Sequence, residues 1–326
     1  MFSVLTRFLH ALATMAAMAL IAFSLLHLLG DPVENMAGQE VSAEDKERLR
    51  DAFGLNASVP ERFASFVLAF VQGDLGRSLQ YRRPIGDLFA ERVPATVELV
   101  LVAAFVSIVA GTLLGVWAAA RPDSVASRIV LTGSVVGVSL PTFATGTLLI
   151  YFFAVALPIF PAFGRGETVD LWGWQTGLLT RSGLMALVLP GATLGLFQLG
   201  IVLRLMRAEM LDVLRANFVL FARARGLPES SVVLVHALRS AMLPVVTVAG
   251  MNLAGLVAYS LITETVFQWP GLGLLFIDAV QFADVPLLAA YMVFVAFVFV
   301  TINLAVDLAY RFIDPRIRAG RSMQPG

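Results

Sequence analysis

Six stretches of about twenty or more apolar residues dominate this sequence, and they favour a membrane-embedded helical protein. They cover residues 8–29, 99–120, 129–157, 184–203, 242–262 and 285–306. An α-helix needs about 20 predominantly apolar residues to cross a bilayer, so each stretch predicts one span. Composition agrees, because 58% of the 326 residues are hydrophobic and only 14% are charged. Soluble domains carry about a quarter charged residues.

The first and third apolar stretches differ from simple spans. The first follows Arg7, as a secretory signal would, but its apolar run exceeds the roughly 7–15 residues of such a signal. No A-x-A cleavage pattern follows it, so we expect a retained first span. The third stretch contains Pro141 and Pro158, and we expect Pro141 to kink it.

Arginine placement predicts the orientation of the spans. The connections after the second and fourth spans and the C-terminal tail are rich in arginine: Arg121, Arg128, Arg204, Arg207, Arg215, Arg223, Arg225, Arg239, Arg311, Arg316, Arg318 and Arg321. On the other side, the loop after the third span carries Arg165 and Arg181. The segment 31–92 contains eight basic residues as well, but long translocated segments largely escape the rule. Both termini are therefore expected in the cytoplasm, with 31–92 outside.

Composition also argues against several kinds of site. The chain has no cysteine, and its three histidines are far apart, so neither disulfides nor a histidine-rich metal site is expected. Zero formal net charge gives no indication of a nucleic acid partner. Lys46, the one lysine, has no glycine near enough to form a P-loop. We expect no cofactor in this chain and no bound nucleotide.

The segment 31–92 is expected to hold two short helices. Ser42 and Asp45 begin a capping-box pattern, which is followed by apolar residues on one helical face and a stop at Gly54. A second helix is predicted over residues 61–71.

The connection between the fourth and fifth spans is the most informative segment. Leu211, Leu214, Phe218 and Phe221 recur at helical spacing and predict an apolar stripe on one helix. The helix is expected to stop at Gly226, since Pro228 follows. A second helix is predicted from residue 229 to 244. Aromatic, small and arginine side chains on a short helix suit docking into the groove of another protein. The alternative is a stripe that lies on the membrane surface.

Resemblance to a known family favours docking. Residues 221–227 and 236–247 resemble the EAA loop of binding-protein-dependent ABC importer permeases, and the chain is most similar to their dipeptide/oligopeptide/nickel (DppB-like) subfamily. Segments 73–78, 92–96, 189–195, 264–273 and 314–318 resemble the same subfamily in the expected order. Leu220 and Phe221 depart from the glutamate and alanine of the wider consensus, and Asn217 departs from the acidic residue that members often carry.

The resemblance implies an all-α membrane protein with about six transmembrane helices. Its fold would be that of a type I (MetI-like) ABC importer permease with an extra periplasmic segment after the first span. Residues 1–94 would form a first helix plus that segment, and 95–326 a five-helix core with a cytoplasmic coupling loop at about 204–241. The residues expected to couple the permease to an ATPase are Phe218, Phe221, Ala222, Arg223, Ala224, Arg225 and Gly226.

The resemblance also implies the partners and the activity. Such a permease is not an enzyme; it pairs with a second, usually different, permease subunit in the bacterial inner membrane. Two cytoplasmic ABC ATPase subunits bind the ATP, and a periplasmic binding protein delivers the substrate. Membrane lipid surrounds the spans. The expected substrates are di- and oligopeptides, with glutathione or a nickel chelate as alternatives.

Polar residues within the spans are candidates for the translocation path, because such residues usually face a cavity or a partner. The candidates are Pro141, Gln198, Asn252, Glu264 and Asn303. Structural roles compete with this interpretation: Glu98 is expected to cap the second span, and Asp307 is spaced to pair with Arg311.

Two other classes of protein remain as alternatives. An ion-coupled secondary transporter is expected to carry charged residues in mid-span, and we find none there. An intramembrane enzyme would need a nucleophile and a base, but Ser134, Ser139 and His236 offer no defensible pair.

Overall fold

The computed structural model describes the backbone of residues 2–28 and 57–313; the helix predicted after Ser42 and the side chains of Asp307 and Arg311 lie outside what it describes. The described chain is mostly helical. Its elements are α1 (Phe2–Leu28), α4 (Val59–Val71), α5 (Ile85–Ala120), α6 (Val125–Ser139), α7 (Thr142–Ile150), the π-helical η1 (Tyr151–Ala156), β1 (Val169–Leu171), β2 (Trp174–Thr176), α8 (Arg181–Val213), α9 (Asn217–Ala224), α10 (Glu229–Ser231), the π-helical η2 (Val232–Ala237), α11 (Leu238–Val266), α12 (Leu272–Gln281) and α13 (Val285–Ile313).

Within these residues, five helical segments are long and apolar enough to cross a membrane, and a bent pair makes a possible sixth. This confirms the predicted helical membrane fold. The third apolar stretch is not one straight span, because α6 and the segment formed by α7 and η1 meet at 111°. Leu140 is extended, with ψ of 134°, and Pro141 precedes the first residue of α7. Proline disfavours the helical conformation in the residue before it, so the break falls where Pro141 was expected to kink the span.

The chain divides into two compact units, which are described separately. One comprises residues 1–93 and 274–301, and the other comprises 94–273 and 302–326. Helices α5, α12 and α13 each continue from one unit into the other. The domain division expected at residues 94 and 95 stays a prediction, because contact units of this kind do not test it.

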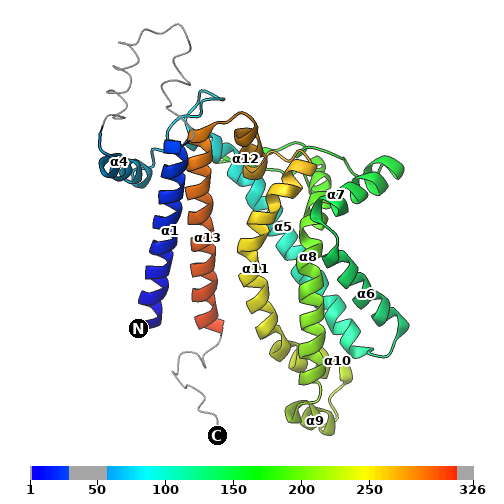
Figure 1. Cartoon of the computed structure of the whole chain (residues 1–326). Coiled ribbons are helices and arrows are strands. Elements are labelled where there is room, and N and C mark those ends of the chain that lie inside the picture. The colour runs from blue at the N-terminus through cyan, green and yellow to red at the C-terminus, as the bar shows by residue number, and fades with distance from the viewer. Residues whose placement is uncertain (1, 29–56, 314–326) are drawn as a thin grey trace. The chain divides into compact units, whose positions relative to one another are not determined.

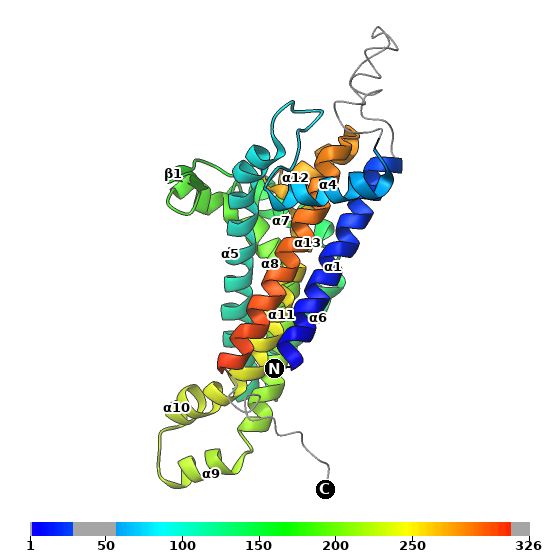
Figure 2. The same cartoon turned by 90° about the vertical axis from the view of Figure 1, so that its left-hand side faces the viewer.

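In the first unit, α1 lies beside α13 and α4 runs across the axis of α1 (Figures 1 and 2). Ala22 of α1 packs with Ala289 and Val293 of α13. The predicted helix at 61–71 is present as α4, and Ser58 and Glu61 form a capping box at its start. The ring of Phe63 in α4 packs edge to face on the ring of Phe23 in α1, with the ring centroids 5.4 Å apart.

The second unit is built around α8 and α11, with α6 and α7 packed on α8 (Figure 1). Helix α5 approaches α8 closely, because Gly111 and Gly115 face it without side chains. A Cβ at Gly115 would lie 2.7 Å from the Cβ of Met206. Two hydrophobic clusters fill this unit, one around Leu99 and Trp269 and one around Met206 and Met210.

Candidate functional site

The single helix predicted to carry residues 211–221, in the loop expected at the cytoplasmic face, is interrupted in the structure. Helix α8 ends at Val213, and the chain turns through residues 214–216 before α9 begins at Asn217. The amides of Arg215 and Ala216 donate to carbonyls only three residues back, and Ala216 is extended with ψ of 147°. The prediction that one helix carries the apolar stripe from Leu211 to Phe221 is therefore wrong. Leu211 and Leu214 pack against one hydrophobic cluster, whereas Phe218 and Phe221 lie outside it.

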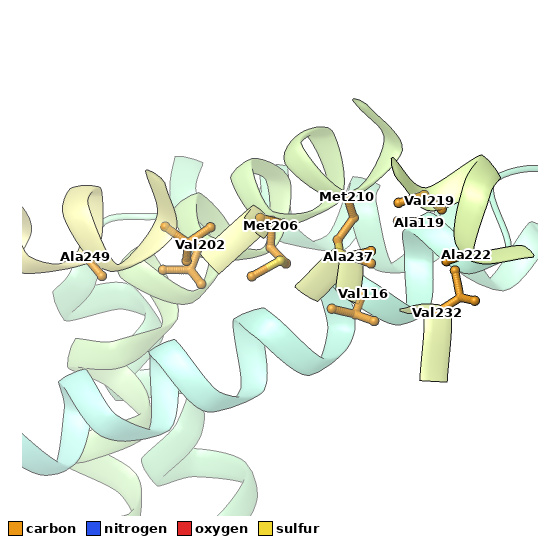
Figure 3. Close-up of a cluster of buried hydrophobic side chains, with 12 residues drawn as sticks. Val116, Ala119, Val202, Met206, Met210, Val219, Ala222, Val232, Ala237 and Ala249 are labelled. Atoms are coloured by element: carbon orange, nitrogen blue, oxygen red, sulfur yellow. The ribbon is translucent and has the colours of Figure 1, made fainter. Parts of the chain in front are cut away.

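Figure 3 shows that cluster, which holds α9 against the ends of three longer helices. Val219 and Ala222 of α9 are buried in it. Val202, Met206 and Met210 come from α8, and further members come from α5, η2 and α11: Val116, Ala119, Val232, Ala237, Ala241, Val245 and Ala249. Ala222 was expected at a docking surface, but it is 6% exposed and packs inside the chain. Burying this apolar face fixes α9 to the unit.

The opposite face of α9 carries large apolar side chains that are exposed. Phe218 is 46% exposed, Leu220 51% and Phe221 64%. The guanidinium carbon of Arg225 lies 5.8 Å from the centroid of the Phe221 ring, which is within cation–π range. Ala224 is also exposed. An exposed aromatic patch rimmed by arginine is typical of a protein-binding surface.

The predicted stop at Gly226 is present, whereas the predicted helix end at Pro244 is wrong. Gly226 has φ of +78°, a left-handed conformation that glycine adopts without strain. From Glu229 the chain is helical through α10, η2 and α11 to Val266, and Pro244 lies inside α11. Membrane helices tolerate an internal proline because neighbouring groups satisfy the freed carbonyl.

The candidates for the translocation path are spread over several elements. Gln198 of α8 is fully buried, and its Nε2 donates to the carbonyl of Ala249 in α11 at 3.4 Å. Its Oε1 is buried with no hydrogen-bond partner among the described residues. Asn252 and Asn303 are half-buried, on α11 and α13. Pro141 is exposed at the break between α6 and α7. Of these residues, Gln198 has the clearest unmet bonding capacity.

Glu264 and Glu98 are both bound inside the second unit. The Glu264 side chain is fully buried and accepts hydrogen bonds from the Thr96 hydroxyl at 2.7 Å and the Gly273 amide at 2.6 Å. Glu98 does not cap the second span, because α5 begins at Ile85; it forms a 2.7 Å buried ion pair with Arg165. Sequence reasoning missed Arg165 as a structural residue. An arginine within a largely apolar loop between spans was the available signal.

The known proteins that this chain resembles are membrane components of transport systems. Residues 111–319 match the family described as "Binding-protein-dependent transport system inner membrane component". The dipeptide transport system permease protein DppB of Haemophilus influenzae is 36% identical, over 97% of this chain and 98% of that protein. The glutathione transport system permease protein GsiC of Escherichia coli O6:H1 is also 36% identical, over 97% and 98%.

A solved structure shares the fold. In the inward-facing MetNI methionine ABC transporter, one chain superposes with a TM-score of 0.54 at 20% identity. The match covers 70% of this chain and 96% of that one.

Proposed function

Because this chain belongs to the family of binding-protein-dependent transport system inner membrane components, and is a permease subunit of an ABC importer, we propose that it carries di- and oligopeptides. It is a multi-pass membrane protein. The substrate class rests on relatives that match it end to end and are named for peptide transport.

The proposed assembly has this chain in a bacterial inner membrane with both termini in the cytoplasm. It pairs with a second permease subunit and receives substrate from a periplasmic binding protein, and two cytoplasmic ATPase subunits complete the assembly. The observation that carries the ATPase assignment is the exposed aromatic face of α9, where Phe218 and Phe221 lie open beside Arg225. ATP would be bound by those partners, since this chain has no P-loop of its own.

The packing of α9 suggests how a movement of the ATPase reaches the membrane. Val219 and Ala222 are buried among side chains from α5, α8 and α11. Protein interiors are close-packed and resist compression, so a displacement of α9 moves the ends of those helices with it. In this proposal α9 transmits the movement, the membrane helices form the translocation path, and ATP hydrolysis takes place on the partner subunit.

Glutathione is the second candidate substrate, because a glutathione permease is as similar to this chain as the dipeptide permease is. Glutathione is itself a tripeptide, so one path could accept both. A nickel chelate has less support, since the described residues include no group of three or more histidine, cysteine, aspartate or glutamate side chains able to hold a metal. We propose Gln198, whose buried Oε1 has no hydrogen-bond partner within the described part of the chain, as the first residue to test in the path.

The ATPase assignment is tested by Phe221→Asp in the complete transporter. A charge on this face should be poorly accommodated in an apolar groove, so the ATPase subunits should no longer co-purify and ATP-driven uptake should be lost. Phe163→Asp is the matched control, because Phe163 is 61% exposed against 64% for Phe221 but lies in the loop before β1. The assignment is wrong if both variants retain the ATPase equally.

The substrate is tested by uptake into proteoliposomes that contain the complete transporter with its binding protein and ATP. Labelled dipeptide, oligopeptide, glutathione and a nickel chelate are each tested for uptake, alone and in competition. We expect a peptide to be transported and to be displaced by other peptides. Transport of nickel chelate alone would reject the proposal.

A further inference from the structure

The guanidinium of Arg223 joins three segments of the coupling loop. Its Nε and Nη2 donate to the two carboxylate oxygens of Glu229 in α10, at 3.1 and 2.6 Å. Its Nη1 donates to the carbonyl of Leu214, in the turn after α8, at 3.4 Å. Arg223 itself lies near the end of α9. One side chain therefore links the turn after α8 and both helices that flank Gly226.

The bend that this side chain spans is open at Gly226, while Val232, directly after α10, packs with Val219 and Ala222 of α9 in the hydrophobic cluster. Gly226 lies between α9 and α10, and a Cβ built there would meet nothing within 4 Å. Backbone hydrogen bonds close the turn, including one from the Gly226 amide to the Arg223 carbonyl at 2.9 Å. They fix the local conformation of the turn, whereas the angle between the helices depends on contacts farther out. A two-pronged arginine–carboxylate pair adds directional specificity of the kind this bend needs.

Arg225 behaves differently from Arg223, although only one residue separates them. Arg225 is exposed, and its described contact is the face of the Phe221 ring. The Arg223 charge is paired within the loop, while that of Arg225 lies beside the exposed aromatic patch. The sequence predicted the same docking role for both arginines, and the structure distinguishes them.

We propose that Arg223 is a positioning residue: by binding Glu229 and the Leu214 carbonyl, it sets the angle between α9 and α10 and so presents Phe218, Phe221 and Arg225 to the ATPase subunit. This inference rests on the proposed function for its partner, but the internal linkage can be tested without one. The pair is partly exposed, so its expected effect is on the shape and affinity of the loop rather than on folding of the chain.

The shape is measured by distances between spin labels. The chain has no cysteine, so Leu220→Cys in α9 and Ser230→Cys in α10 give two specific labels on the full-length chain in lipid nanodiscs. The distance distribution should be narrow with the native pair and broader with Arg223→Ala or Glu229→Ala. The exchange Arg223→Glu with Glu229→Arg should narrow it again in part, since the new pair forms without the Leu214 contact. An unchanged distribution in both single variants would overturn the proposal.

The effect on the partner is measured by adding purified ATPase subunits to reconstituted permease complex. Arg223→Ala and Glu229→Ala should each raise the half-saturating ATPase concentration about threefold to fivefold, as the loss of one well-formed exposed ion pair would. Uptake at saturating ATPase should stay near the native rate, and the charge exchange should recover part of the affinity. Arg225→Ala should weaken binding without broadening the label distances.

These measurements separate the two proposals. If Phe221→Asp leaves ATPase binding intact, the docking surface has been assigned wrongly, whatever the labels report. If Phe221→Asp abolishes binding while Glu229→Ala matches the native protein in both measurements, the docking surface stands and the positioning role of Arg223 is wrong.

Discussion

At the scale of single residues, the Glu98–Arg165 pair is a buried ionic contact in the second unit. The carboxylate of Glu98 also accepts hydrogen bonds from Trp174 Nε1 and from the Gly177 amide, each at 3.3 Å. Arg165 donates to the carbonyl of Gln175 as well. Both charged side chains are nearly fully buried. Together they anchor the β1–β2 hairpin and its flanks to α5.

We predict that Glu98→Gln destabilises the purified chain strongly. Removing one partner leaves the Arg165 charge buried and uncompensated, which typically costs about 3–5 kcal/mol. Replacing both residues, as in Glu98→Leu with Arg165→Met, should cost less than the single change because no charge is left unpaired. Thermal unfolding of the chain in detergent measures the difference. Glu91→Gln is the control, since it breaks the exposed pair with Arg83 and should change stability little.

The residue scale also shows where sequence reasoning was limited. Helical spacing identified the segment that carries Phe218 and Phe221, and both are exposed as docking requires. Spacing alone does not say which face of an amphipathic helix its own chain covers, so it did not separate the buried Ala222 from the exposed Phe221. Glu98 was misjudged because Glu91 and Arg92 interrupt the apolar pattern, although α5 continues through them. Its partner Arg165 is 67 residues away, beyond the reach of any local pattern.

At the scale of elements, the close packing between α5 and α8 depends on glycine residues, which have no side chain. Gly111 faces Val202, where a Cβ would lie 2.8 Å from the nearest atom. Gly115 faces Leu203 and Met206, and the carbonyl of Leu203 would lie 2.8 Å from its Cβ. Small residues at such crossings let helix backbones approach and pack in a membrane.

We predict that Gly115→Ala destabilises the chain although alanine favours helix. The added methyl group would force α5 away from α8, because part of what it meets is backbone that cannot rotate aside. Gly133→Ala in α6 is the matched control, since its Cβ would meet nothing within 4 Å. That variant should be neutral or gain up to about 1 kcal/mol from helix propensity. Equal thermal shifts for the two variants would contradict this account of the packing.

Elements were largely predictable from hydropathy, and their breaks were less so. The spans follow from apolar length, and the short helix α4 was expected from its pattern. Proline predicted the break before α7 but also suggested a false helix end at Pro244. Pro141 and Pro244 therefore differ in whether the helix continues through them, and the packing around each proline, which decides this, cannot be read from the sequence. The turn at 214–216 contains neither glycine nor proline, so no breaker marks it.

At the scale of the whole molecule, the length of α8 determines whether its two ends lie on opposite sides of the membrane. This helix has 33 residues, so it extends about 50 Å, while the hydrocarbon core of a bilayer is about 30 Å thick. The β1–β2 hairpin comes just before its first residue, and α9 follows just after its last. The hairpin and α9 should therefore lie on opposite sides of the membrane.

We predict that single cysteines at these two places react from opposite sides. The chain has no cysteine of its own, so Arg225→Cys and Trp172→Cys each give one reactive site, and both positions are exposed. A membrane-impermeant maleimide should label Arg225→Cys in inside-out vesicles and Trp172→Cys in right-side-out vesicles. The arginine-rich loops predict this orientation through the positive-inside rule. Labelling of both sites from one side would reject α8 as a complete span, and the reversed pattern would place the aromatic face of α9 where no cytoplasmic ATPase could reach it.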